Sequence, residues 1–384
     1  MQVQIGVVGC GMMAQGMHLP NIVKHPGINL KWCCDINSHT LRLVEKKFKP
    51  CQVTMNPEEV ATDPNCDAVL LATTHKARLD LIRLFASAGK HIYVEKPFAG
   101  SLEEMKEILK ILNEYDVKFC VGHNRRMAPA MQEALKVYKK HKGNPVSPSW
   151  RWDREGDLRP AFPEEEQTVM MLRVNDDYFS WKRWAFGEGI LISEMTHFAD
   201  LACMFIDEDP IKVTVKGSKL ANHTIVIEFA DGSLATIVAA AVGSFGYPKE
   251  LIEIYHKGAA ITIDHLVELR VAGVIDEPFR KTFPLANDFA PEIIFDGGIG
   301  DFYRKTLAAH EEAIRKGDNS ILGPAPDKGH YALLDKFVDA IRNGEDTPCN
   351  AKAAARSTAV ILRALESVEQ GGETVEIKKE DYSL

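Results

Sequence analysis

An alternation of short apolar runs and helical segments over the first third of the chain constrains the fold most. The apolar runs, each of which predicts a strand, are residues 3–9, 29–35, 67–73, 91–95 and 117–123. The segments that predict helices are the one after the first run, 38–48, 78–90, and 101–115 with Ser101 as N-cap. Continuous apolar runs indicate strands buried on both faces, and single helices between strands make a sheet parallel. The sequence therefore predicts an α/β fold that begins with a doubly wound parallel sheet.

The pattern changes from about residue 145. The stretch 145–189 is rich in Trp, Arg and Pro, and we expect it to be irregular. Residues then alternate in the two-residue period of a half-covered strand at 212–219, 223–230, 233–242 and 250–264. Helical patterns follow near 300–316, 329–343 and 351–370. These features predict a second α/β domain with a mostly antiparallel sheet.

Composition excludes several classes of protein. The 384 residues exceed what one compact core usually holds, which favours two domains. The formal net charge of −8 argues against nucleic acid or an anionic membrane as the main partner. No apolar run has the length of a membrane span, and the start lacks a secretory pattern, so we expect a cytoplasmic protein. The eight cysteines form no CxxC pair, which predicts buried thiols and no metal site.

A glycine-rich turn joins the first strand to the first helix. The sequence Gly9-Cys10-Gly11-Met12-Met13-Ala14 has the spacing GxGxxA. Gly9 permits a tight turn, Gly11 lets the backbone approach a pyrophosphate, and the helix that starts at Met12 and Met13 favours an anion at its N-terminus. The second strand ends at Asp35, whose carboxylate would bind ribose hydroxyls and repel a 2′-phosphate. We predict a dinucleotide site that prefers NAD to NADP.

The fourth strand leads into Glu95-Lys96-Pro97. Ligands of open parallel sheets bind at the carboxyl ends of the strands, so Lys96 would face the cofactor. An isolated Lys-Pro pair would be interpreted as a surface turn. Here it accompanies Leu71-Ala72-Thr73-Thr74, Gly89-Lys90-His91 and Gly122-His123-Asn124-Arg125-Arg126.

Together these motifs resemble the Gfo/Idh/MocA family of oxidoreductases. The resemblance extends over nearly the whole chain, including Ala230-Asp231-Gly232, Lys257-Gly258 and the pattern from Phe337 to Gly344. It implies a Rossmann domain over residues 1–124, followed by a substrate and oligomerisation domain over 125–384. That second domain would have an open sheet, and the C-terminal helices could pack back on the first domain. Members often assemble as homodimers or homotetramers through the sheet.

The resemblance also implies roles for individual residues. Lys96 would be catalytic and would lie beside the nicotinamide and the substrate, with Asn124 near both. Thr73, Thr74, His75, Arg78 and Glu95 would line the cofactor site, although the family often has Pro, Asn and His where Thr74, His75 and Arg78 stand. His123 occupies a position at which an aromatic residue is common, and it is a candidate for substrate binding.

The stretch SEMTHFADL, residues 193–201, predicts a helix with its polar residues on one face. Ser193, His197 and Asp200 share that face, and Glu194 lies beside it. Histidine has a pKa suited to removing a hydroxyl proton, so His197 is the candidate base. The family often has Asp at the position of Ser193, which puts Ser193 in the substrate site without a charge. Glu194 could replace that charge, or could pair with an Arg of residues 150–185; Asp200 is expected to be structural.

The segment before this helix combines aromatic and basic residues, which suits a sugar or a packed connector equally. Arg151, Arg154 and Arg183 are candidates to bind an acidic substrate, and Arg183 is assigned to the substrate site. The leading functional prediction is an NAD-dependent dehydrogenase of a sugar, a sugar derivative or a cyclitol. The alternatives are a glycosidase that oxidises its substrate transiently with retained NAD, and a non-catalytic nucleotide sensor.

Overall fold

The computed structural model describes residues 2–143, 149–161, 166–176, 189–243, 247–274, 276–285, 297–318 and 323–383. The chain forms two compact units. The first combines Met1–Met127, Gly329–Leu362 and Lys378–Leu384, and the second combines Ala128–Lys328 and Arg363–Ile377. The first unit is therefore built from three separate stretches of chain. In the described ranges, no helix is both long enough and apolar enough to cross a membrane.

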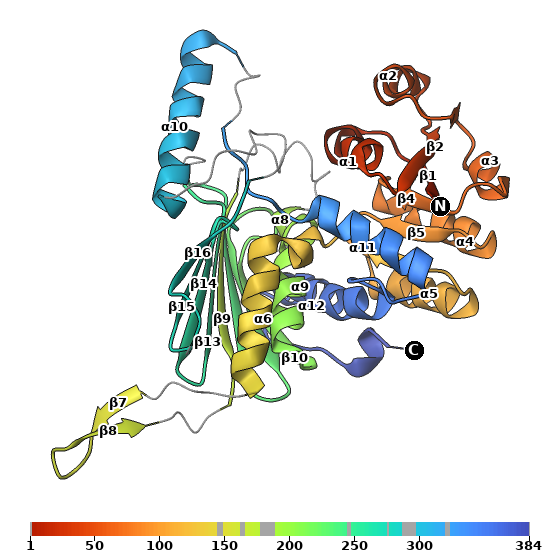
Figure 1. The fold of residues 1–384 in the computed structure, drawn as a ribbon. Helices are drawn as coiled ribbons and strands as arrows, with labels where there is room; N and C mark the ends of the chain where they lie inside the picture. The colour runs from red at the N-terminus through yellow and green to blue at the C-terminus, as the bar shows by residue number, and fades with distance from the viewer. Residues whose placement is uncertain are drawn as a thin grey trace. The chain divides into compact units, whose positions relative to one another are not determined.

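The first unit contains a six-stranded parallel sheet (Figure 1). The strands are β1 (Val3–Val8), β2 (Ile28–Cys34), β3 (Gln52–Thr54), β4 (Ala68–Leu71), β5 (His91–Val94) and β6 (Phe119–Val121). Their order is β3-β2-β1-β4-β5-β6, which is the doubly wound order of a Rossmann domain. The central strands β4 and β5 are almost fully buried, as their apolar runs predicted. The predicted fold class of this domain is confirmed.

The helices of the first unit connect the strands and return from the C-terminal part of the chain. They are η1 (Ala14–His18), α1 (Leu19–Lys24), α2 (Ser38–Phe48), α3 (Pro57–Thr62), η2 (His75–Ala77), α4 (Arg78–Ser87), α5 (Leu102–Glu114), η3 (Asn124–Met127), α11 (His330–Asn343), the start of α12 (Ala351–Glu369) and η4 (Lys379–Asp381). Ser101 caps α5 as predicted, because its side chain accepts the Glu104 N–H at 3.1 Å. The short β3 and α3 had no sequence prediction.

The second unit contains a nine-stranded sheet of order β16-β15-β14-β13-β9-β12-β11-β10-β17. Its strands are β9 (Val169–Asn175), β10 (Pro210–Gly217), β11 (His223–Phe229), β12 (Leu234–Ala240), β13 (Glu250–His256), β14 (Ala259–Asp264), β15 (Glu268–Ala272), β16 (Arg280–Thr282) and β17 (Val375–Glu376). Only the β9–β12 pair is parallel among these described strands. The prediction of a mostly antiparallel sheet is confirmed.

Two predictions for the second unit are wrong. The stretch 145–189 is not irregular throughout, since it includes the hairpin β7 (Ser149–Trp152) and β8 (Leu158–Ala161) and the central strand β9. The alternating segment 250–264 is not one strand. It turns at Lys257 and Gly258, whose φ angles of 44° and 82° reverse the chain between β13 and β14.

Helices cover one face of this sheet. These are α6 (Pro129–Gly143) and α9 (Met195–Ile206); the unit also contains α8 (Gly189–Ser193), α10 (Gly298–Lys316) and the end of α12. Figure 1 shows α6 and α9 side by side along the strands, and both contact the sheet. The opposite face is more open, because Val169, Met171, Val238 and Tyr255 point from it and are 39–44% exposed. An open sheet with one covered face follows, as the family resemblance implied.

Candidate active site

The predicted cofactor residues follow the carboxyl ends of neighbouring parallel strands. Gly9 follows β1, Asp35 follows β2, and Thr73 follows β4, with Glu95 and His123 after β5 and β6. The strand order reverses between β1 and β4, and ligands of doubly wound sheets bind at this reversal. The fold therefore brings these parts of the sequence to one edge of the sheet.

The two glycines of the first turn serve different needs. Gly9 has a φ of 86°, and a Cβ built on it would lie 2.7 Å from the carbonyl oxygen of Ala72. The protein itself therefore requires glycine at this position. At Gly11, no described protein atom lies within 4 Å of the corresponding Cβ position. The space next to Gly11 is therefore open, and a side chain at this position would occupy it. Such an open space beside the backbone fits a bound pyrophosphate.

The helix that follows presents its first amides at the same edge. The backbone N–H of Gln15 donates to the Gly11 carbonyl at 3.0 Å. The side-chain amide of Gln15 donates to the Cys10 carbonyl at 2.8 Å. Helical backbone begins at Met12, so the amides of the first turn have no acceptor within the helix. Met12 and Met13 are 57% and 46% exposed. This arrangement suits an anionic group of a nucleotide.

Asp35 accepts hydrogen bonds from the backbone on both oxygens. The Cys10 N–H donates to Oδ2 at 2.7 Å, and the Asn37 N–H donates to Oδ1 at 2.8 Å. Each carboxylate oxygen has a second lone pair, so Asp35 can still accept a hydroxyl. These bonds fix its carboxylate beside the glycine turn, where it fits a ribose diol and repels a phosphate.

The loop after β4 supplies a buried hydroxyl. The Oγ1 atom of Thr73 is buried, and the described part of the chain offers it no hydrogen-bond partner. Thr74 is exposed and Arg78 is 2% exposed. The structure does not describe the side chain of His75. A buried hydroxyl without a protein partner at this edge is consistent with a ligand group that would complete it.

Glu95 is the centre of a buried polar cluster next to Lys96. His18 Nε2 donates to its Oε1 at 2.6 Å, and the Lys96 N–H donates to its Oε2 at 3.2 Å. Burial alone would raise the pKa of Glu95. The His18 hydrogen bond and the charges of His18, Lys96 and His330 outweigh burial and lower this pKa to about 2. Glu95 is therefore ionised at neutral pH.

The remaining predicted residues of this unit, His123 and Asn124, follow β6, which is the neighbour of β5 in the sheet. His123 is 1% exposed, and its Nδ1 lies 3.6 Å from the Cys349 sulfur. Asn124 is also buried, and its amide nitrogen lies 3.5 Å from His330 Nδ1. His330 begins α11, so the C-terminal stretch of chain contributes to the same cluster. The sequence prediction included neither His18 nor His330.

In the second unit, the predicted helix 193–201 is interrupted. Glu194 has φ −121° and ψ −37° and separates α8 from α9. The Ser193 hydroxyl donates to the Gly189 carbonyl at 2.6 Å within its own helix. His197 and Asp200 are 3% and 1% exposed. The break thus falls at Glu194, whose carboxylate has a partner outside the helix.

That partner is Lys249, which precedes β13. Its Nζ lies 2.7 Å from Glu194 Oε1 and 2.8 Å from Asp176 Oδ2. Both carboxylates are less than 9% exposed. Glu194 thus pairs with a lysine that the sequence did not suggest, and Arg183 of the segment considered from the sequence lies outside the described residues. No local pattern in the sequence connects these three residues.

Some predicted substrate residues cannot be placed. Arg183 lies outside the described residues, and the side chain of Arg151 is not described. Arg154 is exposed on the turn between β7 and β8. The three arginines therefore remain predictions.

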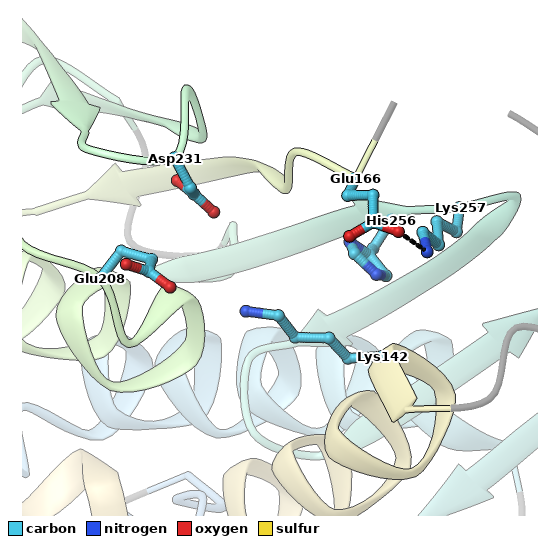
Figure 2. Close-up of a pocket in the computed structure, with 6 residues that line it drawn as sticks. All are labelled: Lys142, Glu166, Glu208, Asp231, His256 and Lys257. Atoms are coloured by element: carbon cyan, nitrogen blue, oxygen red, sulfur yellow. Dashed lines mark hydrogen bonds and ion pairs between the residues drawn. The ribbon is translucent and has the colours of Figure 1, made fainter. Parts of the chain in front are cut away.

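Figure 2 shows a pocket in the second unit that is lined by Lys142, Glu166, Glu208, Asp231, His256 and Lys257. None of the predicted site residues lines it. His256 Nδ1 lies 3.2 Å from the Thr168 hydroxyl, which itself bonds to the Tyr138 hydroxyl at 2.6 Å. Burial is the main cause that lowers the pKa of His256 to about 4, so it is neutral at neutral pH. We interpret this histidine as part of the packing of α6 on the sheet.

Comparisons with known proteins show similarity to oxidoreductases. Residues 3–123 match the family model described as "Oxidoreductase family, NAD-binding Rossmann fold". The inositol 2-dehydrogenase of Rhizobium meliloti is 24% identical over 346 residues, which cover 87% of this chain and 94% of that protein. The myo-inositol 2-dehydrogenase of Thermotoga maritima is 25% identical over 279 residues, covering 70% and 77%.

A solved structure shares the fold of the whole chain. The scyllo-inositol dehydrogenase of Lactobacillus casei, with bound NAD(H) and scyllo-inositol, superposes with a TM-score of 0.70 over 98% of this chain and 99% of that one, at 17% identity. The sheet, its glycine turn and the sequence matches define an NAD-dependent oxidoreductase that acts on CH–OH groups. The part of the chain that matches the Gfo/Idh/MocA family model is residues 3–123.

Proposed function

We propose that this protein oxidises a ring hydroxyl of a cyclitol or sugar, with Lys96 and His197 as its catalytic residues. Bound NAD supplies the hydride acceptor. The Lys96 ammonium stabilises the negative charge that develops on the substrate oxygen, and His197 accepts the hydroxyl proton. The observation that carries the proposal is the place of Lys96 at the carboxyl end of β5, beside an ionised Glu95 and at the same sheet edge as Gly9 and Asp35. The inositol dehydrogenases among the relatives support the substrate class.

The remaining predicted residues divide between the cofactor and the substrate. Gly9, Gly11, Met12, Met13 and Asp35 would hold the nucleotide, with Thr73, Thr74, His75 and Arg78 along its side and Glu95 and Asn124 toward the nicotinamide. His123, Asn124, Arg183 and Ser193 would contact the substrate. We assign Glu194 a structural role instead of the catalytic role considered from the sequence, because its buried carboxylate pairs with Lys249.

Turnover of a panel of cyclitols, sugars, sugar acids and glycosides tests the activity. We expect NADH to form in proportion to the oxidised product. Release of an aglycone without net NADH would instead support the redox-assisted glycosidase. Binding of NAD without turnover of any panel member would support the nucleotide sensor.

Lys96→Met and His197→Ala test the two catalytic roles. Each should lower kcat by at least about 100-fold, the scale of acid–base catalysis, with little change in melting temperature. Lys90→Met is the matched control for Lys96, because Lys90 precedes the other end of β5 and donates to the Asp63 and Cys66 carbonyls. His223→Ala is the control for His197, since both are buried histidines of the second unit. Near-normal turnover of either catalytic variant would contradict its role.

We also propose that the protein assembles as a homodimer or homotetramer through the open face of the second sheet. The exposed apolar side chains Val169, Met171 and Val238 support this assembly. Light scattering of the wild type and of Val238→Lys measures it, and a monomeric wild type would contradict it.

A further inference from the structure

A short π-helical segment connects the cofactor turn to the Glu95 cluster. Residues Ala14–His18 form η1, in which the Leu19 N–H donates to the Ala14 carbonyl five residues earlier. Pro20 follows and has no N–H, so the regular helical ladder cannot continue through it. Single π-helical turns are rare in proteins, and those that occur are often found at functional sites. They redirect a side chain at some cost in stability. The side chain that ends this turn is His18.

His18 is 4% exposed, and its Nε2 lies 2.6 Å from Glu95 Oε1. Glu95 is ionised, so its oxygens can only accept, and His18 Nε2 must carry the proton that joins them. The His18 ring also packs edge-on against Tyr93, with centroids 5.7 Å apart. A buried polar pair can fix one conformation as well as contribute stability.

The carboxylate held by His18 fixes the backbone of Lys96. One oxygen of Glu95 is bound by His18 and the other by the Lys96 N–H. A Cβ on Gly122 would lie 3.2 Å from Glu95 Oε1, so glycine in β6 leaves room for this arrangement. The groups whose charges act on Glu95 are His18, Lys96 and His330, and Tyr93 lies beside it. The peptide that carries Lys96 therefore has a fixed orientation.

We propose that His18 is a positioning residue for Lys96, acting through the carboxylate of Glu95. This inference rests on the proposed role of Lys96. Without the His18 bond, the Glu95 side chain can rotate and the Lys96 peptide loses its anchor. Misplacement of a reacting group by about 1 Å can lower a rate by about 100-fold.

Four variants test the proposal by steady-state kinetics and NADH binding. His18→Leu removes the donor and should lower kcat by about 100-fold, with KM and NADH affinity nearly unchanged. His18→Gln keeps an N–H donor and should restore most of kcat. Glu95→Gln keeps the shape of the side chain but not its charge, and should lower kcat as His18→Leu does. His25→Leu is the matched control, because His25 is a buried histidine of the same unit whose Nε2 lies 3.0 Å from Asp335 Oδ1.

A second readout does not depend on activity. A brief pulse of an acetylating N-hydroxysuccinimide ester, followed by peptide mass spectrometry, measures the reactivity of the Lys96 amine in the protein without NAD. His18→Leu should change this reactivity relative to the exposed Lys110, and His25→Leu should not. If Lys96→Met keeps its turnover, the proposed function fails, while the labelling of Lys96 still decides the role of His18.

Unchanged kcat and unchanged Lys96 labelling in a folded His18→Leu would overturn the proposal. An equal loss of kcat in His25→Leu would also overturn it, since the effect would then be general. If His18→Leu does not fold, the same two measurements, kcat and Lys96 labelling, are made on Glu95→Gln. Normal values of both in that variant would overturn the proposal.

Discussion

We expect acid to lower the free energy of unfolding by an amount that follows from the pKa of Glu95. Its pKa falls from the ordinary 4.5 to about 2 in the folded protein, because the His18 bond and nearby positive charges outweigh burial. A depressed carboxyl pKa means that folding favours the ionised form. This contribution is fully present above pH 4.5 and is lost as the pH falls toward 2.

The size of the contribution follows from the two pKa values. The fall from 4.5 to about 2 corresponds to about 3 kcal/mol, at 1.36 kcal/mol for each pKa unit. Urea unfolding of the wild type and of Glu95→Gln, followed by circular dichroism from pH 7 to pH 2.5, measures it. The difference between the two proteins isolates Glu95 from the other carboxyl groups. The wild type should lose most of that amount relative to the variant between pH 4.5 and 2.5.

The comparison can contradict the reasoning in two ways. A difference that stays constant with pH would show that Glu95 has an ordinary pKa in the folded state. A wild type that gains stability relative to Glu95→Gln on acidification would show that burial dominates and that the carboxyl is protonated when folded.

Three further predictions concern the cofactor turn and the Lys249 cluster. Asp35→Ser should raise the ratio of NADP to NAD affinity by at least about tenfold in fluorescence titration, since the repelling charge is lost; an unchanged ratio would contradict the role of Asp35. Gly11→Ala should keep the melting temperature and lose NADH affinity, whereas Gly9→Ala should lose about 1–3 kcal/mol of stability because of its φ of 86°; equal effects would contradict the distinction. Lys249→Met should cost about 3 kcal/mol in urea unfolding, because two buried carboxylates lose their counter-ion; Lys249→Arg should recover most of it.

The sequence predicted what local patterns encode. The buried strands β1, β4 and β5 are continuous apolar runs, and the helices between the strands predicted that the sheet is parallel. Gly9, Asp35 and Lys96 could be assigned to one sheet edge because the carboxyl ends of parallel strands share it. Local patterns were therefore enough to predict where a cofactor would bind.

The remaining features depend on contacts between distant parts of the chain. β9 lies in a stretch without clear alternation, and its place is set by pairing with β12 and β13. His18 and Glu95 are 77 residues apart, and a histidine two residues before a proline was the only local signal. Lys249 meets Glu194 only after the sheet has formed. Such partners have no period or motif, so sequence reasoning considered a catalytic role or an arginine partner for Glu194 and did not find Lys249.

The three-part construction of the first unit has a consequence for the order of synthesis. On the edge beside β6, the Val121 N–H donates to the Cys349 carbonyl at 2.9 Å, and the Thr347 hydroxyl donates to the Phe119 carbonyl. A ribosome adds roughly 5–20 residues per second, so β6 emerges many seconds before the segment that completes it. During that interval Ala128–Lys328, the larger part of the second unit, is translated. The cofactor domain is thus the first part of the chain to be made and among the last to be finished.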